Sequence, residues 1–314
     1  MKAAQIIKYG GAEAITFNEN VQAPTIASGK VIVEVHAAGI NPFDWKVRAG
    51  YFEKMIPLQF PTILGGDFSG AITEVGEGVL DFQKGDEVFG SASILNGGSG
   101  SLAEYDLADV KTIAHKPKNV NHLEAAALPL AAVSAIQALI EHISLNQGQK
   151  ILIHGGAGGI GSFAIQLAKH LGAYVATTVS TNHIDYVKNL GADEVIDYKN
   201  QAFENILKDY DAVFDAVGGE VNAKSYQVLR KGGILVSMTE KPNNELMQQY
   251  EVNAMAQQTA VNADRLIKLA ELVEQGAIKV HIDKVFPLEQ AGTALTYLQD
   301  GHVRGKVVVE VNKG

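Results

Sequence analysis

A glycine-rich turn between an apolar run and a helical pattern constrains the fold of this chain more than any other feature. Residues 151–153 read Ile-Leu-Ile, an apolar run typical of a buried parallel strand. Gly156, Gly158 and Gly161 follow with the spacing G-x-G-x-x-G, and apolar residues then recur at helical intervals over 160–171. Glycines alone would indicate only a turn. A strand, a glycine turn and a helix in this order predict a dinucleotide-binding unit.

Each glycine has its own expected role. Gly156 allows a tight turn after the strand, Gly158 lets a pyrophosphate approach the backbone, and Gly161 lets the helix pack closely on the strand. The helix N-terminus offers unpaired N–H groups and a partial positive charge to the phosphates. We therefore expect the cofactor to be bound by the residues of this turn, which are Gly156, Ala157, Gly158, Gly159, Ile160 and Gly161.

The turn after the next predicted strand, 174–179, indicates which dinucleotide is bound. An NAD site usually carries Asp or Glu about 20 residues after the glycine turn, where the carboxylate binds the ribose 2′-OH. No carboxylate stands here; the residues are Ser180, Thr181, Asn182 and His183. Neutral donors suit a 2′-phosphate that an acid would repel, so the sequence predicts NADP as the cofactor, bound as NADPH.

How the 2′-phosphate is held is left open, because no Arg or Lys stands in this turn. The candidates are the neutral donors, His183, or Tyr198 and Lys199 at the end of the following predicted strand. The neutral residues are also ordinary helix N-cap types, and both roles can coexist.

Composition excludes several classes of function. The chain has 314 residues, enough for two domains, and no cysteine, which excludes disulfides and thiolate chemistry and fits a reducing compartment. No apolar run approaches the length of a membrane span, and the first residues lack the pattern of a signal peptide. A net charge of −9 argues against general nucleic-acid binding. We expect a cytoplasmic protein with a small-molecule substrate, without nucleic-acid or membrane partners.

The order of predicted elements indicates two kinds of architecture. The first third is rich in short strands, whereas strands and helices alternate from residue 151 to residue 237, as in a doubly wound parallel sheet. A long helical pattern over 124–143, interrupted by Pro129, separates them, and strand character returns in the tail. We expect an α/β fold, with a dinucleotide-binding domain at 123–276 and a discontinuous β-rich domain formed by 1–122 and 277–314.

Four further segments carry a family resemblance. They are AAGINPFDWKVRAG (37–50), FPTILGGDFSGAITEVGEGVLDFQKGDEVFG (60–90), LGADEVIDY (190–198) and GKVVVEV (305–311). With the glycine turn, they resemble the medium-chain dehydrogenase/reductase superfamily and, more closely, its zinc-free quinone oxidoreductase branch, the zeta-crystallin-like enzymes. The resemblance runs over nearly the whole chain. It implies a GroES-like catalytic domain beside the Rossmann domain, and NADPH-dependent reduction of quinones or α,β-unsaturated carbonyls by hydride transfer.

The resemblance also bears on zinc. Alcohol dehydrogenases of the superfamily hold a catalytic zinc through a Cys and a His-Glu pair, and the matching positions here are Asn41 and Gly66-Asp67. Asn is a poor zinc ligand and Gly is none, so we expect no metal. Hydride transfer without a metal requires an electron-poor acceptor, and hydrogen-bond donors near the acceptor oxygen stabilise the charge that develops there.

Two residues are the candidates for catalysis. Asn41 can donate to the substrate oxygen or to the nicotinamide ribose, or it can be only a turn residue before Pro42. Tyr51 can donate a proton, or it can only pack. Asp44 and Arg48 stand at i and i+4, and we expect them to form a structural ion pair.

The resemblance places further residues beside the cofactor. Ser134 matches a position next to the nicotinamide, although its hydroxyl can instead bond the preceding helical turn. The other positions that it places along the cofactor are Val217, Gly218, Met238 and Lys306. Met238 can also be simple packing.

Two other functions stay open. An enoyl-thioester reductase would use a basic patch for the thioester's phosphates, for which Lys46, Arg48 and Lys54 are the candidates. A catalytically idle NADPH-binding redox sensor would show the same glycine turn. The strand at 252–256 should lie at a sheet edge, and edge strands are either protected or paired. In the family that the chain resembles this region often pairs two subunits, so the resemblance implies a homodimer.

Overall fold

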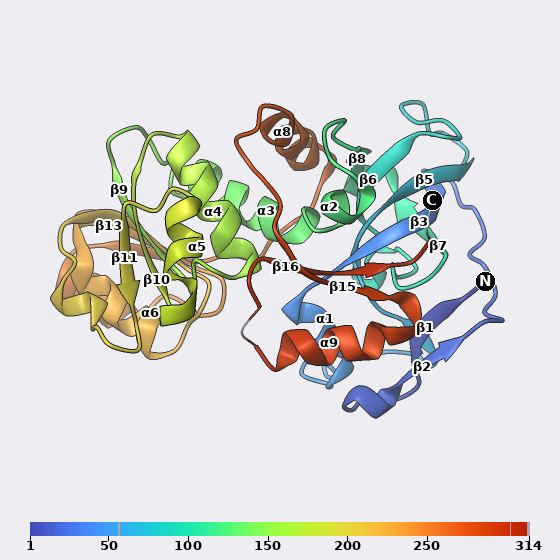
Figure 1. Ribbon diagram of the computed structural model, residues 1–314, viewed down its shortest axis with the longest axis horizontal. Helices are drawn as coiled ribbons and strands as arrows, with labels where there is room; N and C mark the ends of the chain where they lie inside the picture. The colour runs from blue at the N-terminus through green and yellow to red at the C-terminus, as the bar shows by residue number, and fades with distance from the viewer. Residues whose placement is uncertain (56, 302, 313–314) are drawn as a thin grey trace. The chain divides into compact units, whose positions relative to one another are not determined.

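The computed structural model describes residues 1–55, 57–301 and 303–312. The chain forms two compact units (Figure 1). The first unit consists of Met1–Ala131, Val261–Gln275 and Val280–Gly314, and the second of Ala132–Ala260 with Gly276–Lys279. Compared with the expected division at residues 122 and 276, these contacts place 123–131 and 261–275 with the first unit.

Two sheets make up the strands of the first unit. The larger sheet has the order β15 (Ile282–Pro287), β16 (Lys306–Glu310), β3 (Lys30–Ile40), β5 (Asp67–Val75), β6 (Glu87–Ser91), β8 (Ile113–His115), with β7 (Tyr105–Asp109) also paired to β3. The smaller sheet has the order β2 (Ile15–Asn18), β1 (Ala3–Ile6), β4 (Thr62–Ile63). Every pairing in these sheets is antiparallel except β15 with β16, among the residues that the structure describes. This is the predicted β-rich, discontinuous part of the chain.

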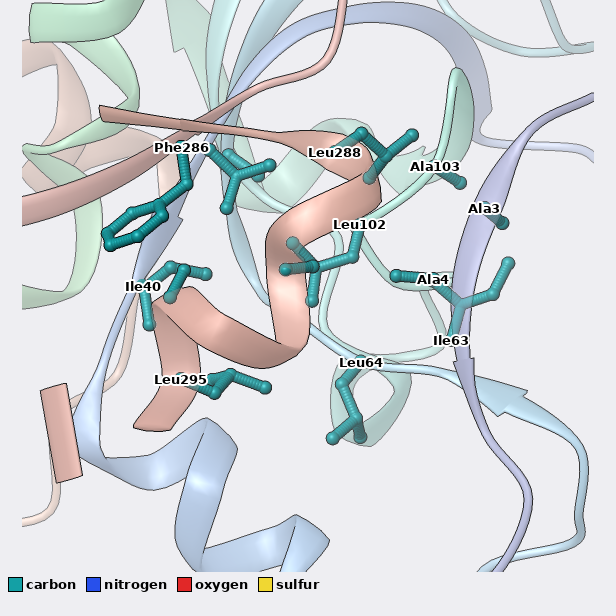
Figure 2. Close-up of a cluster of buried hydrophobic side chains, with 14 of the residues drawn as sticks. Ala3, Ala4, Ile40, Ile63, Leu64, Leu102, Ala103, Phe286, Leu288 and Leu295 are labelled. Atoms are coloured by element: carbon teal, nitrogen blue, oxygen red, sulfur yellow. The ribbon is translucent and has the colours of Figure 1, made fainter. Parts of the chain in front are cut away.

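Helices cover the sheets of the first unit. They are α1 (Pro42–Arg48), α2 (His122–Ala126), α8 (Ala263–Glu274) and α9 (Ala291–Gln299), with short 3-10 helices at Ala12–Ala14, Ile94–Asn96, Val110–Thr112 and Leu288–Gln290. Figure 2 shows one buried core of this unit, in which side chains from β1, β3, β15 and α9 meet. Ile40 and Leu295 lie in this core at 1% and 0% exposure, so the end of β3 is anchored where α1 begins.

The second unit contains one parallel sheet of six strands. Its order is β11 (Glu194–Asp197), β10 (Tyr174–Val179), β9 (Lys150–His154), β12 (Tyr210–Asp215), β13 (Leu229–Ser237), β14 (Asn253–Ala256). The α-helices of this unit are α4 (Gly159–His170), α5 (Ile184–Asn189), α6 (Glu220–Ser225) and α7 (Asn244–Tyr250), with 3-10 helices at Thr181–His183, Phe203–Asn205 and Tyr226–Val228. The predicted doubly wound sheet is confirmed. Its order reverses between β9 and β12, and in such folds ligands bind at the carboxyl ends of the strands beside this point.

Differences from the predicted elements have local causes. The helical pattern over 124–143 divides into α2, then α3 (Pro129–Ile136), then a π-helix (Gln137–His142). Pro129 has no N–H to continue a helix but suits the first position of the next one, so α3 starts there. The predicted strand at 252–256 forms as β14 at the sheet edge. Within the described residues, none of the helices has both the length and the apolarity needed to cross a membrane.

Candidate functional site

The glycine turn, residues 155–161, joins the carboxyl end of β9 to α4. Gly155 has φ +71°, so the left-handed step of the turn lies one residue before Gly156, for which the sequence predicted a tight turn. A Cβ on Gly156 would overlap the Thr177 hydroxyl of β10, and a Cβ on Gly161 would overlap the carbonyl oxygen of Gly155. These two glycines are therefore required by close packing within the second unit. The role predicted for Gly161 agrees with this geometry.

Gly158 differs from its neighbours because the fold leaves room beside it. A Cβ built there would meet only the carbonyl oxygen of Gly155, at 3.4 Å, which is ordinary van der Waals contact. Gly158 is the N-cap of α4, and Ser162 N donates to its carbonyl at 2.9 Å. The N–H groups of 159–161 precede that bond and have no partner outside the helix within the described part of the chain, so they can meet a ligand. Open space over a bare backbone at a helix N-terminus fits a pyrophosphate.

A carboxylate from the neighbouring strand lies against the turn after β10, which nothing in the local sequence indicated. Asp197 ends β11, pairs with Val179 in the sheet, and accepts a hydrogen bond from Thr181 Oγ1 at 2.6 Å. It also accepts from Asn200 Nδ2 at 2.7 Å and from Lys199 N at 3.1 Å. These hydrogen bonds hold the pKa of Asp197 below its ordinary value, and the bond from Thr181 has the largest effect. Residues 180–183 carry no acid, as the sequence indicates, but Asp197 of the neighbouring strand lies against this turn.

Asp197 changes which groups can bind a 2′-phosphate. A hydroxyl has one hydrogen, and Thr181 gives it to Asp197, so Thr181 Oγ1 can only accept from a ligand. Ser180 Oγ lies 3.4 Å from His183 Nδ1, and the side chain of Asn182 is exposed. Tyr198 is 58% exposed, and its N–H donates to the carbonyl of Val179. The side chains left as donors at this turn are Ser180, Asn182, His183, Tyr198 and Lys199.

Residues after β12 and β13 lie at the same edge of the sheet. Asp215, fully buried at the end of β12, accepts from Val217 N at 2.9 Å and Gly218 N at 3.0 Å. A Cβ on Gly155 would lie 3.1 Å from Val217 Cγ2, so Val217 borders the glycine turn. Met238 N bonds the carbonyl of Asp215 at 2.9 Å. The structure therefore brings Val217, Gly218 and Met238 together at the carboxyl edge. Asp215 acts there as a capping acid.

Ser134 lies in α3 and is fully buried. Its hydroxyl is 2.7 Å from Thr259 Oγ1, and its carbonyl accepts from Gln257 Nε2 at 3.0 Å. These contacts tie α3 to the segment after β14. The predicted place of Ser134 beside a nicotinamide stays a prediction.

A buried polar cluster forms the candidate site of the first unit. This Asn41 cluster consists of Asn41, Asp44, Asp67 and Lys306, which are between 2% and 6% exposed. Asn41 Nδ2 donates to Asp67 Oδ2 at 2.8 Å, and Lys306 Nζ donates to Asn41 Oδ1 at 2.5 Å. Asp44 Oδ2 accepts from Asn41 N at 2.8 Å. The sequence indicated each residue separately, but nothing in its periodicity indicated that they meet.

Burial dominates the electrostatics of this cluster. It raises the pKa of Asp44 to about 7, and the nearby charge of Asp67 adds to the effect. Burial also raises the pKa of Asp67 and lowers the pKa of Lys306, while the attraction between these two groups opposes both shifts. One ammonium and one carboxylate balance each other, which leaves Asp44 as the group that takes a proton near neutral pH.

Known proteins resemble this chain over nearly its whole length. A family model for the alcohol dehydrogenase GroES-like domain matches residues 27–118, and one for zinc-binding dehydrogenases matches 190–309. The NADPH-dependent alkenal/one oxidoreductase of Arabidopsis thaliana is 38% identical over 98% of this chain and 79% of its own. The chloroplast envelope quinone oxidoreductase homolog of the same plant is 36% identical over 99% and 98%. The structure of a quinone oxidoreductase from Coxiella burnetii superposes with a TM-score of 0.91, 35% identity and 99% coverage of both chains.

The chain belongs to the quinone oxidoreductase branch of the medium-chain dehydrogenase/reductase superfamily. It is thus an oxidoreductase by family, as the resemblance of its segments indicated. One of the matching models describes zinc-binding dehydrogenases, so the fit of this chain's residues to zinc needs to be tested.

The residues of this chain do not fit a zinc ion. No group of three or more His, Cys, Asp or Glu side chains that could hold a metal occurs among the described residues. At the matching positions, Gly66 offers no side chain, and the amide oxygen of Asn41 faces the Lys306 ammonium. A cation placed there would meet another positive charge at close range.

Two predictions near the Asn41 cluster have different outcomes. The prediction of an Asp44–Arg48 ion pair is wrong. Arg48 Nη2 donates to Gln299 Oε1 at 2.6 Å, while Asp44 accepts a hydrogen bond from the backbone N–H of Asn41. The cause is that Asp44 serves the first turn of α1 and Arg48 faces α9. Tyr51 is 70% exposed and meets Trp45 edge-on at 5.7 Å between ring centroids. Its role as a proton donor stays a prediction.

Proposed function

We propose that this protein is an NADPH-dependent reductase of quinones and α,β-unsaturated carbonyl compounds that works without a metal ion. The observation that carries the proposal is the Asn41 cluster, which puts an amide donor and an ammonium where related alcohol dehydrogenases hold zinc. The names of the two plant relatives, an NADPH-dependent alkenal/one oxidoreductase and a quinone oxidoreductase homolog, support the substrate class.

The cofactor fits the carboxyl edge of the six-stranded sheet. The backbone of residues 156–161 would hold the pyrophosphate, and Gly158 leaves room for it, since a Cβ there would meet only the carbonyl oxygen of Gly155. The donors available for a 2′-phosphate are Ser180, Asn182, His183, Tyr198 and Lys199. NADPH, when bound, supplies the hydride. The chain's own task here is to orient the cofactor.

The Asn41 cluster supplies the electrostatic part of the reaction. Hydride addition to a quinone or enone places negative charge on the acceptor oxygen, and a preorganised N–H donor stabilises that charge. The amide of Asn41 is such a donor, with the positive charge of Lys306 behind it. The reaction needs an electron-poor acceptor, because the residues of the Asn41 cluster do not fit a metal ion that could polarise a simple ketone. Saturated aldehydes and ketones should therefore be poor substrates.

The decisive experiment follows NADPH oxidation at 340 nm, with NADH run alongside. The panel contains 1,2-naphthoquinone, 9,10-phenanthrenequinone, a short alkenal, a cyclic enone and the matching saturated ketone. We expect turnover of the quinones or enones with NADPH preferred, and no turnover of the saturated ketone. NADPH binding without turnover of any compound would favour the redox-sensor function instead.

Enoyl-thioester reduction is the second candidate, and one observation weakens it. Of the predicted basic patch, Arg48 is only 1% exposed and is bonded to Gln299, so it cannot meet the phosphates of a thioester carrier. Lys46 and Lys54 remain. A crotonyl thioester reduced faster than every free enone would restore this candidate.

We also propose a homodimer. Its support is β14, which ends the six-stranded sheet and leaves one strand edge available for pairing with a second copy. Light scattering at micromolar concentration should give twice the chain mass of 33.5 kDa. A monomeric mass contradicts the proposal.

A cytoplasmic location is proposed from composition. The absence of cysteine suits a reducing compartment. Fractionation of the source cells, followed by immunoblotting, should find the protein with cytoplasmic markers, and enrichment in an organelle would contradict this.

A further inference from the structure

The ends of three strands bring the Asn41 cluster together. Asn41 follows the last residue of β3, Asp67 is the first residue of β5, and Lys306 is the first residue of β16. The register pairs Gly39 with Asp67 and Ile40 with Val307, so all three side chains lie at one end of the larger sheet. Lys306 Nζ is also anchored by the carbonyl of Ile40 at 3.1 Å.

The two partners of the Asn41 amide determine its orientation. An ammonium can only donate and an ionised carboxylate can only accept. Lys306 therefore requires the amide oxygen on its side, and Asp67 requires the NH2 group on the other. A flipped amide would turn its NH2 toward the ammonium and its oxygen toward the carboxylate, and both hydrogen bonds would become repulsive contacts. Asp67 is itself fixed, since both of its oxygens accept from Leu130 N at 3.1 Å.

This clamp leaves one donor available. The Asn41 NH2 group has two hydrogens, and the structure gives it one acceptor, Asp67, within the described part of the chain. The second N–H keeps a fixed direction as long as the oxygen is held by Lys306. Without Lys306, only the bond from the amide to Asp67 would oppose a rotation by 180°, which would present a carbonyl oxygen in place of the second N–H.

We propose that Lys306 is a positioning residue, which fixes the amide of Asn41 so that its second N–H, and not its carbonyl oxygen, meets the substrate oxygen. The proposal rests on the proposed function, because it assigns Asn41 the donor role toward a quinone or enone. It differs from the predicted role of Lys306 as a direct cofactor contact. In the structure the ammonium already donates to Asn41 and to Ile40 within its own unit.

Steady-state kinetics of Lys306 variants test this role. We compare Lys306→Met, which has no donor, with Lys306→Arg, which keeps donors, and with Lys84→Met, an exposed lysine in the turn before β6. We expect Lys306→Met to lower kcat about 10-fold or more, with KM and the NADPH dissociation constant changed less than about 3-fold, because the lost donor acts on developing charge. Lys306→Arg should recover part of kcat. Lys84→Met should match the wild type.

Three outcomes overturn the proposal. One is a kcat of Lys306→Met equal to that of Lys84→Met. Another is a weakened NADPH affinity with kcat unchanged, which means that Lys306 binds the cofactor. The third outcome comes from the double variant Lys306→Met/Asp67→Asn. This variant removes both buried charges, so it can fold even where Lys306→Met alone cannot. Full activity of this double variant shows that Lys306 is only a counter-charge.

A measurement without turnover separates this proposal from the proposed function. In 15N-labelled protein, the side-chain NH2 signals of Asn41 are assigned by their loss in Asn41→Asp. In the wild type we expect slow exchange of these hydrogens with solvent, and in Lys306→Met exchange faster by about 10-fold or more. Equal exchange rates overturn the clamp. Protected signals in a wild type that reduces no substrate contradict the proposed function and leave the clamp standing.

Discussion

The glycine turn of the second unit is built from the backbone of one continuous run, 155–161, whereas the Asn41 cluster of the first unit is built from side chains up to 265 residues apart. The turn depends on residues that have no side chain. The cluster depends on strand register, because β3, β5 and β16 must end together before Asn41 can meet its partners. A change in the turn should therefore act through steric overlap. A change in the cluster should act through charge.

The largest effect should come from Gly161→Ala. Its Cβ would overlap the carbonyl oxygen of Gly155, which is backbone and cannot move without distorting the turn. We expect the free energy of unfolding to fall by about 3 kcal/mol and NADPH binding to be lost. Urea unfolding and fluorescence titration with NADPH measure the two effects.

Gly158→Ala is the matched control for that variant. The nearest atom to its Cβ is 3.4 Å away, so stability should fall by less than about 1 kcal/mol, while NADPH affinity falls about 10-fold. If Gly158→Ala binds NADPH as tightly as the wild type, the pyrophosphate does not lie over this residue.

A second charge effect concerns Asp106 of β7, which is fully buried. Neither of its oxygens has a hydrogen-bond partner among the described residues, and burial raises its pKa well above the ordinary value. The folded protein keeps this proton while the unfolded chain loses it above pH 4, so Asp106 lowers stability as pH rises. Asp106→Asn should raise the free energy of unfolding at pH 7, and the gain over the wild type should grow as the pH rises above 4.

The same variant supplies its own control at low pH. At pH 3 Asp106 is protonated in both states, so Asp106→Asn should match the wild type in thermal or urea unfolding. An equal gain at pH 3 and pH 7 would show that the effect is one of packing and not of ionisation.

Asp44 tests the same physics inside the Asn41 cluster. Its pKa is raised to about 7 in the folded protein, so its contribution to stability is present below pH 4 and is lost as pH rises toward 7. Between pH 4 and pH 7, Asp44→Asn should lose about 3 kcal/mol less unfolding free energy than the wild type, which flattens this part of the stability profile. A profile as steep as that of the wild type would mean that Asp44 stays ionised.

These predictions also show what the sequence could reveal. The glycine turn and the order of the parallel sheet follow from local patterns, since a strand, a turn and a helix are each encoded within a short run. The partners of Asn41 and the approach of Asp197 to Thr181 depend on which residues stand opposite each other in paired strands. The Asp44–Arg48 spacing suggested a pair, but tertiary contacts with Asn41 and Gln299 replaced it.

The smallest effect concerns Asp197, the acid beside the proposed 2′-phosphate site. Asp197→Asn removes a negative charge, and its amide oxygen can still accept from Thr181. We expect the preference for NADPH over NADH, measured as the ratio of kcat/KM values, to rise about 3- to 10-fold. Asp209→Asn, which makes the same change before the amino end of β12, should leave the ratio unaltered. No difference between the two variants would place the 2′-phosphate elsewhere.

The most direct test of a metal-free reductase measures zinc content and activity in one sample. The protein is dialysed against a strong chelator, its zinc is measured by mass spectrometry, and NADPH oxidation is followed with the best quinone or enone. We expect far less than one zinc per chain and a kcat equal to that of the untreated enzyme. One zinc per chain before dialysis, with activity lost on its removal and restored by zinc, would contradict it.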